Sequence, residues 1–199
     1  MSTKMNLCLN PYESVFVIFD KEMPLYPVPV TSCLHQKRPK GNATWKQVKD
    51  WTITWKENGI SMHTDTLFDW SKHAHDSIRY YSGHARYSTT ISCKKSEIKN
   101  APIILSLGEV HDIAHVWVNG IDCGIAWMAP YEIDITQALK KGKNIIEIEI
   151  TNTWHNALRG ADEGKAPYEG IWTNAKYRTK GNELLPSGLL GPITLKNED

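Results

Sequence analysis

The fold class is decided by the stretch from Leu105 to Trp154, LSLGEVHDIAHVWVNGIDCGIAWMAPYEIDITQALKKGKNIIEIEITNTW. Within it, Asn119–Gly120 separates the apolar run Val116–Val118 from a second run that begins at Ile121. Asn-Gly between apolar runs is a strong hairpin signal, because both central residues of a type I′ turn adopt a positive φ. The stretch therefore predicts two antiparallel strands joined by a tight turn.

The second half of this stretch shows the alternation of half-buried strands. Ile146, Ile148 and Ile150 alternate with two glutamates and a threonine, and Tyr131–Ile135 shows the same period of two. Such alternation places one face of a strand on a core and the other in water. Thr136 is expected to cap the short turn that follows.

Further strands are predicted by short apolar runs between turn signals. Trp51–Trp55 alternates tryptophan and isoleucine with threonine, whereas Gly59–Asp76 is polar and rich in histidine and is expected to be a long excursion. The other expected strands cover residues 85–91, 103–107, 171–177 and 189–195. Many short strands with turns between them indicate an all-β sandwich.

Residues 1–50 differ in character from the rest of the chain. Val15–Phe19 is apolar on both faces, which fits a strand covered on both sides, and we expect it to pair with the sandwich or with a second copy. The prolines between Lys21 and Lys49 predict an extended connection. We therefore predict an N-terminal strand with a proline-rich connection over residues 1–50 and a β-sandwich over residues 51–199.

The composition excludes several classes of partner. The 199 residues carry a net charge of +1, so no bulk field attracts nucleic acid or an anionic membrane. No apolar run approaches the ~20 residues of a membrane helix. The first residues lack the apolar core of a signal peptide, so this sequence leaves the localisation unknown. We expect no nucleic-acid and no membrane partner.

The four cysteines carry no recognisable motif. They are Cys8, Cys33, Cys93 and Cys123. No pair has C-x-x-C spacing, so neither a zinc knuckle nor a redox motif is supported. We expect free thiols that are mostly buried, with a single disulfide as the alternative.

Several motifs, spread in order over nearly the whole chain, carry a family resemblance. They are Asn10–Phe19, Leu67–Trp70, Ile78–Gly83, Leu107–Val110, Val118–Gly120, Gly124–Trp127, Asp134–Thr136, Gly142–Asn144 and the closing LPSGLLGP at Leu185–Pro192. Together they resemble the C-terminal region of family 106 glycoside hydrolases, the bacterial α-L-rhamnosidases. The middle part is similar, more loosely, to the sugar-binding-like sandwich of family 2 glycosidases.

The resemblance implies a galactose-binding-like jelly roll that forms the tail of a much larger enzyme of carbohydrate metabolism. In that family the catalytic barrel, with its acid and base carboxylates, lies upstream of the matched region, and the enzymes are typically periplasmic or secreted. One departure concerns Trp154-His155-Asn156-Ala157, because the family usually has Arg where this chain has Ala157. Any role of that Arg is therefore in doubt here.

Two pairs of acidic residues could serve as the carboxylate pair of a glycoside hydrolase. Hydrolysis needs two carboxyl groups ~5–9.5 Å apart. Glu147 and Glu149 are two residues apart on one strand face, which separates them by ~6.7 Å. The favoured interpretation is that this face is the solvated outer face of a sandwich. Glu109 and Asp112 are interpreted in the same way. We therefore predict no catalytic residues in this chain.

Histidines offer two groupings for a metal, and neither is convincing. His73 and His75 with His84, and His111 with His115, lack a Cys or acidic partner at diagnostic spacing. No loop has the acidic density of a calcium site, although one structural Ca²⁺ remains an alternative. We predict no metal ligands and no cofactor.

Aromatic and polar residues near Trp154 are the best candidates for binding a sugar. A sugar stacks its C–H face on Trp, while amide, carboxylate and guanidinium groups bond its hydroxyls. The candidates are Trp154, His155, Asn156, Arg159 and Asp162, expected in a loop after a strand, with Trp127 and Trp172 near it. The alternative is that these tryptophans fill the core or face a neighbouring domain.

Two hypotheses of function follow. The first is a non-catalytic accessory module, structural or carbohydrate-binding, of an α-L-rhamnosidase-type glycoside hydrolase, with the catalytic domain as its partner. The second is a free-standing protein that binds an oligosaccharide weakly through the Trp154 loop. An active hydrolase is a third and weaker alternative.

Overall fold

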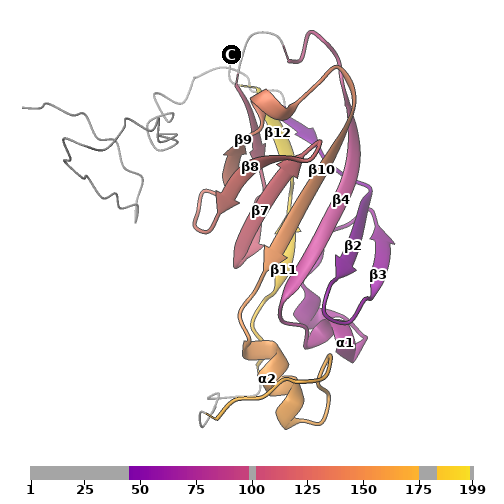
Figure 1. The fold of residues 1–199 in the computed structure, drawn as a ribbon, viewed down its shortest axis with the longest axis vertical. Coiled ribbons are helices and arrows are strands. Elements are labelled where there is room, and N and C mark those ends of the chain that lie inside the picture. The colour runs from indigo at the N-terminus through magenta and orange to yellow at the C-terminus, as the bar shows by residue number, and fades with distance from the viewer. Residues whose placement is uncertain (1–44, 99–101, 175–182, 198–199) are drawn as a thin grey trace, which may run out of the picture. The chain divides into compact units, whose positions relative to one another are not determined.

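The computed structural model describes residues 45–98, 102–174 and 183–197 (Figure 1). The chain divides into two units, Met1–Lys40 and Gly41–Asp199, and all described residues belong to the second. The strand expected at Val15–Phe19 lies outside the described residues. The elements are β1 (Trp45–Gln47), β2 (Trp51–Trp55), β3 (Ser61–Thr64), η2 (Trp70–Lys72), α1 (Asp76–Arg79), β4 (His84–Cys93), β5 (Ile103–Ser106), β6 (Glu109–His111), β7 (Ile113–Val118), β8 (Ile121–Ala126), β9 (Glu132–Asp134), η3 (Thr136–Ala138), β10 (Gly142–Thr151), α2 (His155–Asp162), β11 (Gly188–Gly191) and β12 (Thr194–Asn197).

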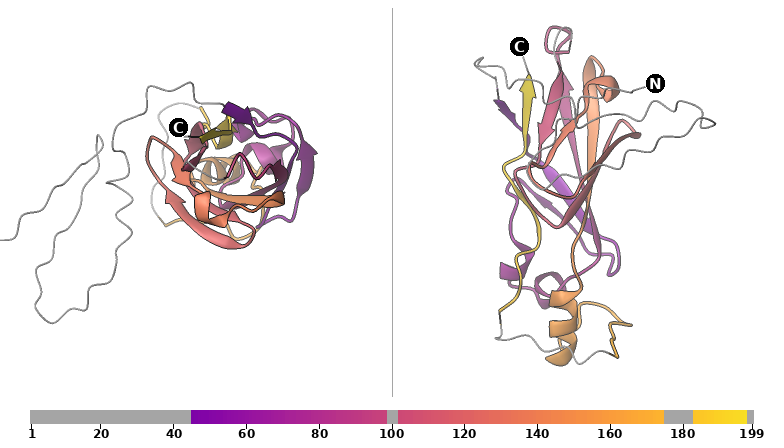
Figure 2. Two further views of the ribbon diagram at one scale, coloured as in Figure 1. Left: turned by 90° about the horizontal axis from the view of Figure 1, so that it is seen from above. Right: turned by 90° about the vertical axis from the view of Figure 1, so that its left-hand side faces the viewer.

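The strands form two main antiparallel sheets, which confirms the predicted all-β sandwich. One has six strands in the order β3-β2-β4-β10-β7-β8, and the other has four in the order β1-β12-β5-β9. β11 pairs with β6 as a small third sheet. α2 lies beyond one end of the sandwich, past the end of β10 (Figures 1 and 2). No helix in the described residues is long and apolar enough to cross a membrane.

The isoleucine alternation of β10 positions the core as predicted. Ile146, Ile148 and Ile150 are each 0% exposed, and β10 is the central partner of β4 on one side and β7 on the other. Ile148 lies opposite Tyr87 in β4 and Val116 in β7. The glutamates between the isoleucines therefore project from the outer face of the six-stranded sheet.

The predicted hairpin is also confirmed. Asn119 and Gly120 have φ values of 54° and 78° and join β7 to β8. The Asn119 amide adds long-range contacts, because its Nδ2 donates to the Ala138 carbonyl at 2.8 Å and to Asn144 Oδ1 at 2.9 Å. This asparagine thus shapes the turn and anchors it to η3 and to the start of β10.

Three of the eight tryptophans are core residues. Trp51, Trp55 and Trp70 are fully buried, and the Trp55 and Trp70 rings meet edge to face with centroids 5.9 Å apart. Trp70 Nε1 donates to the Tyr87 hydroxyl at 2.8 Å, so the buried indole keeps a hydrogen-bond partner. These three tryptophans are not among the candidates for sugar binding, Trp127, Trp154 and Trp172, which are all exposed.

Several local predictions were wrong. The stretch 59–76 contains β3 and leads into α1, and residues 171–174 form no strand, while 175–177 lie outside the described residues. The strand predicted at 189–195 is two strands, β11 and β12, separated by Pro192 and Ile193. Thr136 does not cap its turn; its hydroxyl accepts the Ile103 N–H at 2.8 Å. β1 pairs with β12, so the sandwich begins before residue 51.

Candidate functional site

The expected loop at Trp154–Asp162 is a helix, which corrects the prediction for the candidate sugar site. α2 runs from His155 to Asp162, and Trp154 precedes it with half of its side chain exposed. The helix has no local side-chain cap at its beginning. Contacts with distant segments therefore hold it in place.

Asn156 supplies the strongest of these contacts. It is 2% exposed, and its Nδ2 donates to the Leu185 carbonyl at 2.8 Å and to Ser187 Oγ at 3.0 Å. Its Oδ1 accepts the Leu185 N–H at 2.9 Å. Both ends of the amide are used inside the protein, so Asn156 anchors α2 to the segment that contains Leu185 and Ser187.

The closing motif Leu185–Pro192 continues this anchor into the core. The Ser187 N–H donates to Asp69 Oδ1 at 3.0 Å, and the Ser187 carbonyl accepts the Trp70 N–H at 3.0 Å. Gly188 has a φ of 98°, and a Cβ there would lie 2.5 Å from the Trp70 ring. The motif therefore provides close packing and hydrogen bonds for the scaffold.

Asp69 is the charged centre of this anchor. Its side chain is 5% exposed, and its Oδ1 also accepts hydrogen bonds from the N–H and hydroxyl of Ser71. Burial alone would raise the pKa of Asp69, but the hydrogen bonds from Ser187 and Ser71 and the charge of Lys72 lower that pKa below its usual value. Asp69 is therefore a stable carboxylate.

The other side of α2 packs on the segment after α1. The Ala157 N–H donates to Ser82 Oγ at 3.1 Å, and a Cβ on Gly160 would lie 2.8 Å from the Tyr80 side chain. Ala157 is 0% exposed. The position at which the chain departs from the rhamnosidase pattern thus faces the interior of the module.

The remaining candidates differ in their exposure. Trp154, Trp127 and Trp172 are 50%, 64% and 75% exposed, and Asp162 is exposed as well. His155 and Arg159 are half-buried, and Arg159 Nε lies 3.1 Å from Glu163 Oε1.

The strand register brings Trp127 toward the same end of the sheet as Trp154. Ala126 lies opposite Ala114, and Ala114 lies opposite Ile150 near the end of β10. Trp127 follows Ala126, and Trp154 follows β10. The sandwich thus presents exposed indoles where β8 and β10 both end.

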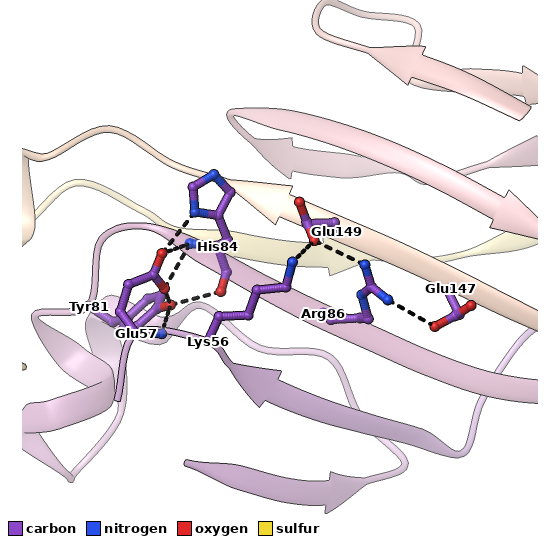
Figure 3. Close-up of polar contacts among 7 residues, drawn as sticks. All are labelled: Lys56, Glu57, Tyr81, His84, Arg86, Glu147 and Glu149. Carbon is purple, nitrogen blue, oxygen red and sulfur yellow. Dashed lines mark hydrogen bonds and ion pairs between the residues drawn. The ribbon is translucent and has the colours of Figure 1, made fainter. Parts of the chain in front are cut away.

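The glutamates considered for catalysis lie in an ion-pair ladder on the outer face of the six-stranded sheet, drawn in Figure 3. Arg86 contacts Glu147 Oε1 and Glu149 Oε2, each at 3.3 Å, and Lys56 also donates to Glu149. Burial would raise the pKa of Glu149, yet Lys56 and Arg86 outweigh it and lower that pKa. Glu149 is therefore poorly suited to act as a general acid.

Glu57 forms a second polar cluster that the sequence did not reveal. Its carboxylate accepts hydrogen bonds from the Tyr81 hydroxyl and from the His84 N–H, and lies 2.8 Å from His84 Nδ1 (Figure 3). A Cβ on Gly83 would lie 2.6 Å from this carboxyl group. The cluster ties the end of β2 to the start of β4, which is a structural role.

The histidine groupings considered for a metal are not formed. His111 Nε2 lies 2.9 Å from Glu109 Oε1, and His115 Nε2 lies 2.9 Å from Asp122 Oδ1. His111 and His115 therefore each pair with a separate carboxylate. The free thiols among the described residues are Cys93, which is buried, and Cys123.

Comparison with known proteins identifies the family. Residues 61–183 match the family described as glycosyl hydrolase 2 galactose-binding domain-like. The chain belongs to this family. The match runs from β3 through α2, so it includes the end of the sandwich that carries Trp154.

Two curated relatives of this galactose-binding-like domain are much longer proteins. A putative beta-glucuronidase from Formosa agariphila is 35% identical over 155 residues, which is 66% of this chain and 13% of that protein. A beta-galactosidase from Priestia megaterium is 34% identical over 94 residues, which is 46% of this chain and 9% of that protein. The chain therefore spans about a tenth of the length of these relatives.

Solved structures of similar proteins agree with the fold. The rhamnosidase from Novosphingobium sp. PP1Y is 35% identical, with a TM-score of 0.66 over 79% of this chain and 16% of that one. A beta-D-glucuronidase from Dictyoglomus thermophilum is 18% identical, with a TM-score of 0.58 over 81% of this chain and 29% of that one. The latter supports the fold alone.

Proposed function

We propose that this galactose-binding-like domain is the non-catalytic accessory module of an α-L-rhamnosidase-type glycoside hydrolase. The observation that carries the proposal is the match to the Novosphingobium rhamnosidase, at 35% identity over 79% of the chain. The ordered motifs from Leu67–Trp70 to Leu185–Pro192 support the same parent. The partner of the module is then a catalytic domain that supplies the acid and base carboxylates.

The chemistry of the outer sheet face supports a non-catalytic role. Glu147 and Glu149 have the spacing of a glycosidase pair, but both are ion-paired to Arg86, and Glu149 also binds Lys56. A glycosidase needs one carboxylic acid with a raised pKa to protonate the leaving group. The pKa of Glu149 is shifted in the opposite direction.

The first test is an activity assay with the purified chain. Aryl α-L-rhamnosides, aryl β-glucuronides and aryl β-galactosides are offered in turn, and we expect no turnover of any of them. Glu147→Gln and Glu149→Gln serve as matched variants. Hydrolysis by the wild type that disappears in either variant would overturn the non-catalytic role.

The exposed tryptophans favour a second candidate function, weak carbohydrate binding. Trp154, Trp127 and Trp172 offer flat apolar faces, and Asp162 offers an acceptor for sugar hydroxyls. A shallow site of this kind gives a Kd of about 0.1–10 mM, equivalent to ~3–5.5 kcal/mol. Rhamnose- and galactose-containing oligosaccharides of plant cell walls are the candidate ligands.

The second test is a titration with such oligosaccharides, followed by tryptophan fluorescence or NMR. Trp154→Ala and Asp162→Ala should weaken binding. Ile121→Ala is the matched control, because Ile121 is 52% exposed but lies beside the Asn119–Gly120 turn, at the opposite end of β8 from Trp127. No signal change at tens of millimolar would assign the tryptophans to a protein contact instead.

A further inference from the structure

One cluster of side chains of the types that bind metals lies apart from the ion-pair ladder around Arg86 and from the exposed Trp127 and Trp154. It consists of Asp50, His63 and Asp65, at the edge of the six-stranded sheet that β3 forms beside β2. Asp50 comes directly before β2, His63 lies in β3, and Asp65 comes directly after β3. All three are exposed.

The strand register explains why these side chains converge. Thr52 lies opposite His63 and Trp51 lies opposite Thr64, so the next step along the hairpin places Asp50 against Asp65. Residues two apart on a strand project from the same face, which brings His63 to the same side as Asp65. His63 Nε2 lies 2.9 Å from Asp50 Oδ1, and one ligand atom from each of the three residues lies within 4.8 Å of the others.

The cluster combines two carboxylates with one imidazole. Asp50 and Asp65 are two carboxylates at facing positions, and like charges directly opposite each other destabilise a strand pair. The one basic side chain among the three ligands is the imidazole of His63. A bound divalent cation would replace this repulsion with attraction on both sides of the hairpin.

We propose that Asp50, His63 and Asp65 form a surface site for a divalent transition metal ion of the Zn²⁺ type. One imidazole with two carboxylates is a ligand set that suits zinc, whereas calcium takes six to eight oxygen ligands. Zinc bonds of ~2.0–2.2 Å place neighbouring ligand atoms about 3.3 Å apart, and exposed side chains can close to that separation by rotating. The fourth position belongs to water, and the ion would clamp β3 to β2.

Two other histidine–carboxylate pairs show what is particular to this cluster. Glu109–His111 and His115–Asp122 have the same 2.9 Å contact as Asp50–His63. Within the part of the chain that the structure describes, only the Asp50 pair has a third ligand, Asp65, in reach. These pairs therefore provide an internal control for the contribution of the third ligand.

The test is calorimetric titration of the whole chain with Zn²⁺ after its thiols have been blocked by alkylation. We expect one ion per chain, and at least tenfold weaker binding in Asp65→Asn and in His63→Gln. His111→Gln should bind as the wild type does. Asp65→Asn is the decisive variant, because it leaves the Asp50–His63 contact intact and removes only the third ligand.

Two further readouts keep the proposal falsifiable if a variant folds poorly. Co²⁺ should broaden the amide signals of residues 50, 63 and 65 in the wild-type NMR spectrum. Zn²⁺ should raise the melting temperature of the wild type but not that of Asp65→Asn, because a ligand that binds only the folded state stabilises it. Absence of one-to-one binding up to millimolar Zn²⁺, or wild-type affinity in Asp65→Asn, would overturn the site.

Discussion

The middle of the sandwich and its α2 end, where Asp69–Trp70 and Leu185–Gly188 meet beside α2, are stabilised in different ways. In the middle, β10 buries Ile146, Ile148 and Ile150 between β4 and β7, so the contacts follow from strand alternation. At the α2 end, Asp69 and Ser187 are 118 residues apart in the chain and share a buried hydrogen bond. The comparison teaches that a periodic core is visible in the sequence, whereas an end held by long-range polar contacts is not.

The largest expected effect tests the periodic core. Ile148→Ala should destabilise the domain by about 2–5 kcal/mol, because it removes a fully buried side chain and leaves a cavity. Glu147→Ala, the adjacent residue on the outer face, should change stability by about 0.5 kcal/mol, since exposed ion pairs contribute little. Urea denaturation of both variants measures the difference. If Glu147→Ala were the more damaging substitution, the assigned strand faces would be reversed.

The next effect tests the packing that supports the α2 end. Gly188→Ala should cost about 1–3 kcal/mol more than Gly142→Ala, because overpacking adds to the strain of the backbone. The two glycines have similar φ values, 98° and 89°, but a Cβ on Gly142 would meet nothing within 4 Å. At Gly188 it would lie 2.5 Å from the Trp70 ring. Equal losses in thermal melts would mean that Trp70 moves aside and that the end is loosely packed.

Much of the sheet could be predicted because its signals are local. The Asn119–Gly120 turn and the alternation of β2 and β10 each depend on residues close together in the chain, and all were confirmed. The interruption at Pro192–Ile193 was missed because the two short strands around it resemble one apolar run.

The candidate site was less predictable, because its residues act through distant partners. Trp154 is exposed, whereas Asn156 is buried and its amide donates hydrogen bonds to Leu185 and Ser187, about thirty residues later in the chain. The proximity of His63 and Asp65 to Asp50 follows from the pairing of β2 with β3, which the sequence alone does not specify. Composition and spacing carry no information about such pairings.

The smallest expected effect concerns the response of the α2 end to acid. The pKa of Asp69 is lower in the folded protein than in the unfolded chain, so its carboxylate stabilises the fold above its unfolded pKa of about 4. That contribution is lost as the pH falls through the lower, folded pKa. Asp69→Asn should therefore be less stable than the wild type at pH 7 and lose less stability on acidification.

Asp162→Asn, which changes an exposed carboxylate at the same end, should keep the wild-type response. Denaturant melts between pH 7 and pH 2 measure both variants. Parallel curves for Asp69→Asn and the wild type would show that the bond from Ser187 to Asp69 does not depend on charge, and that packing alone distinguishes the α2 end from the periodic core.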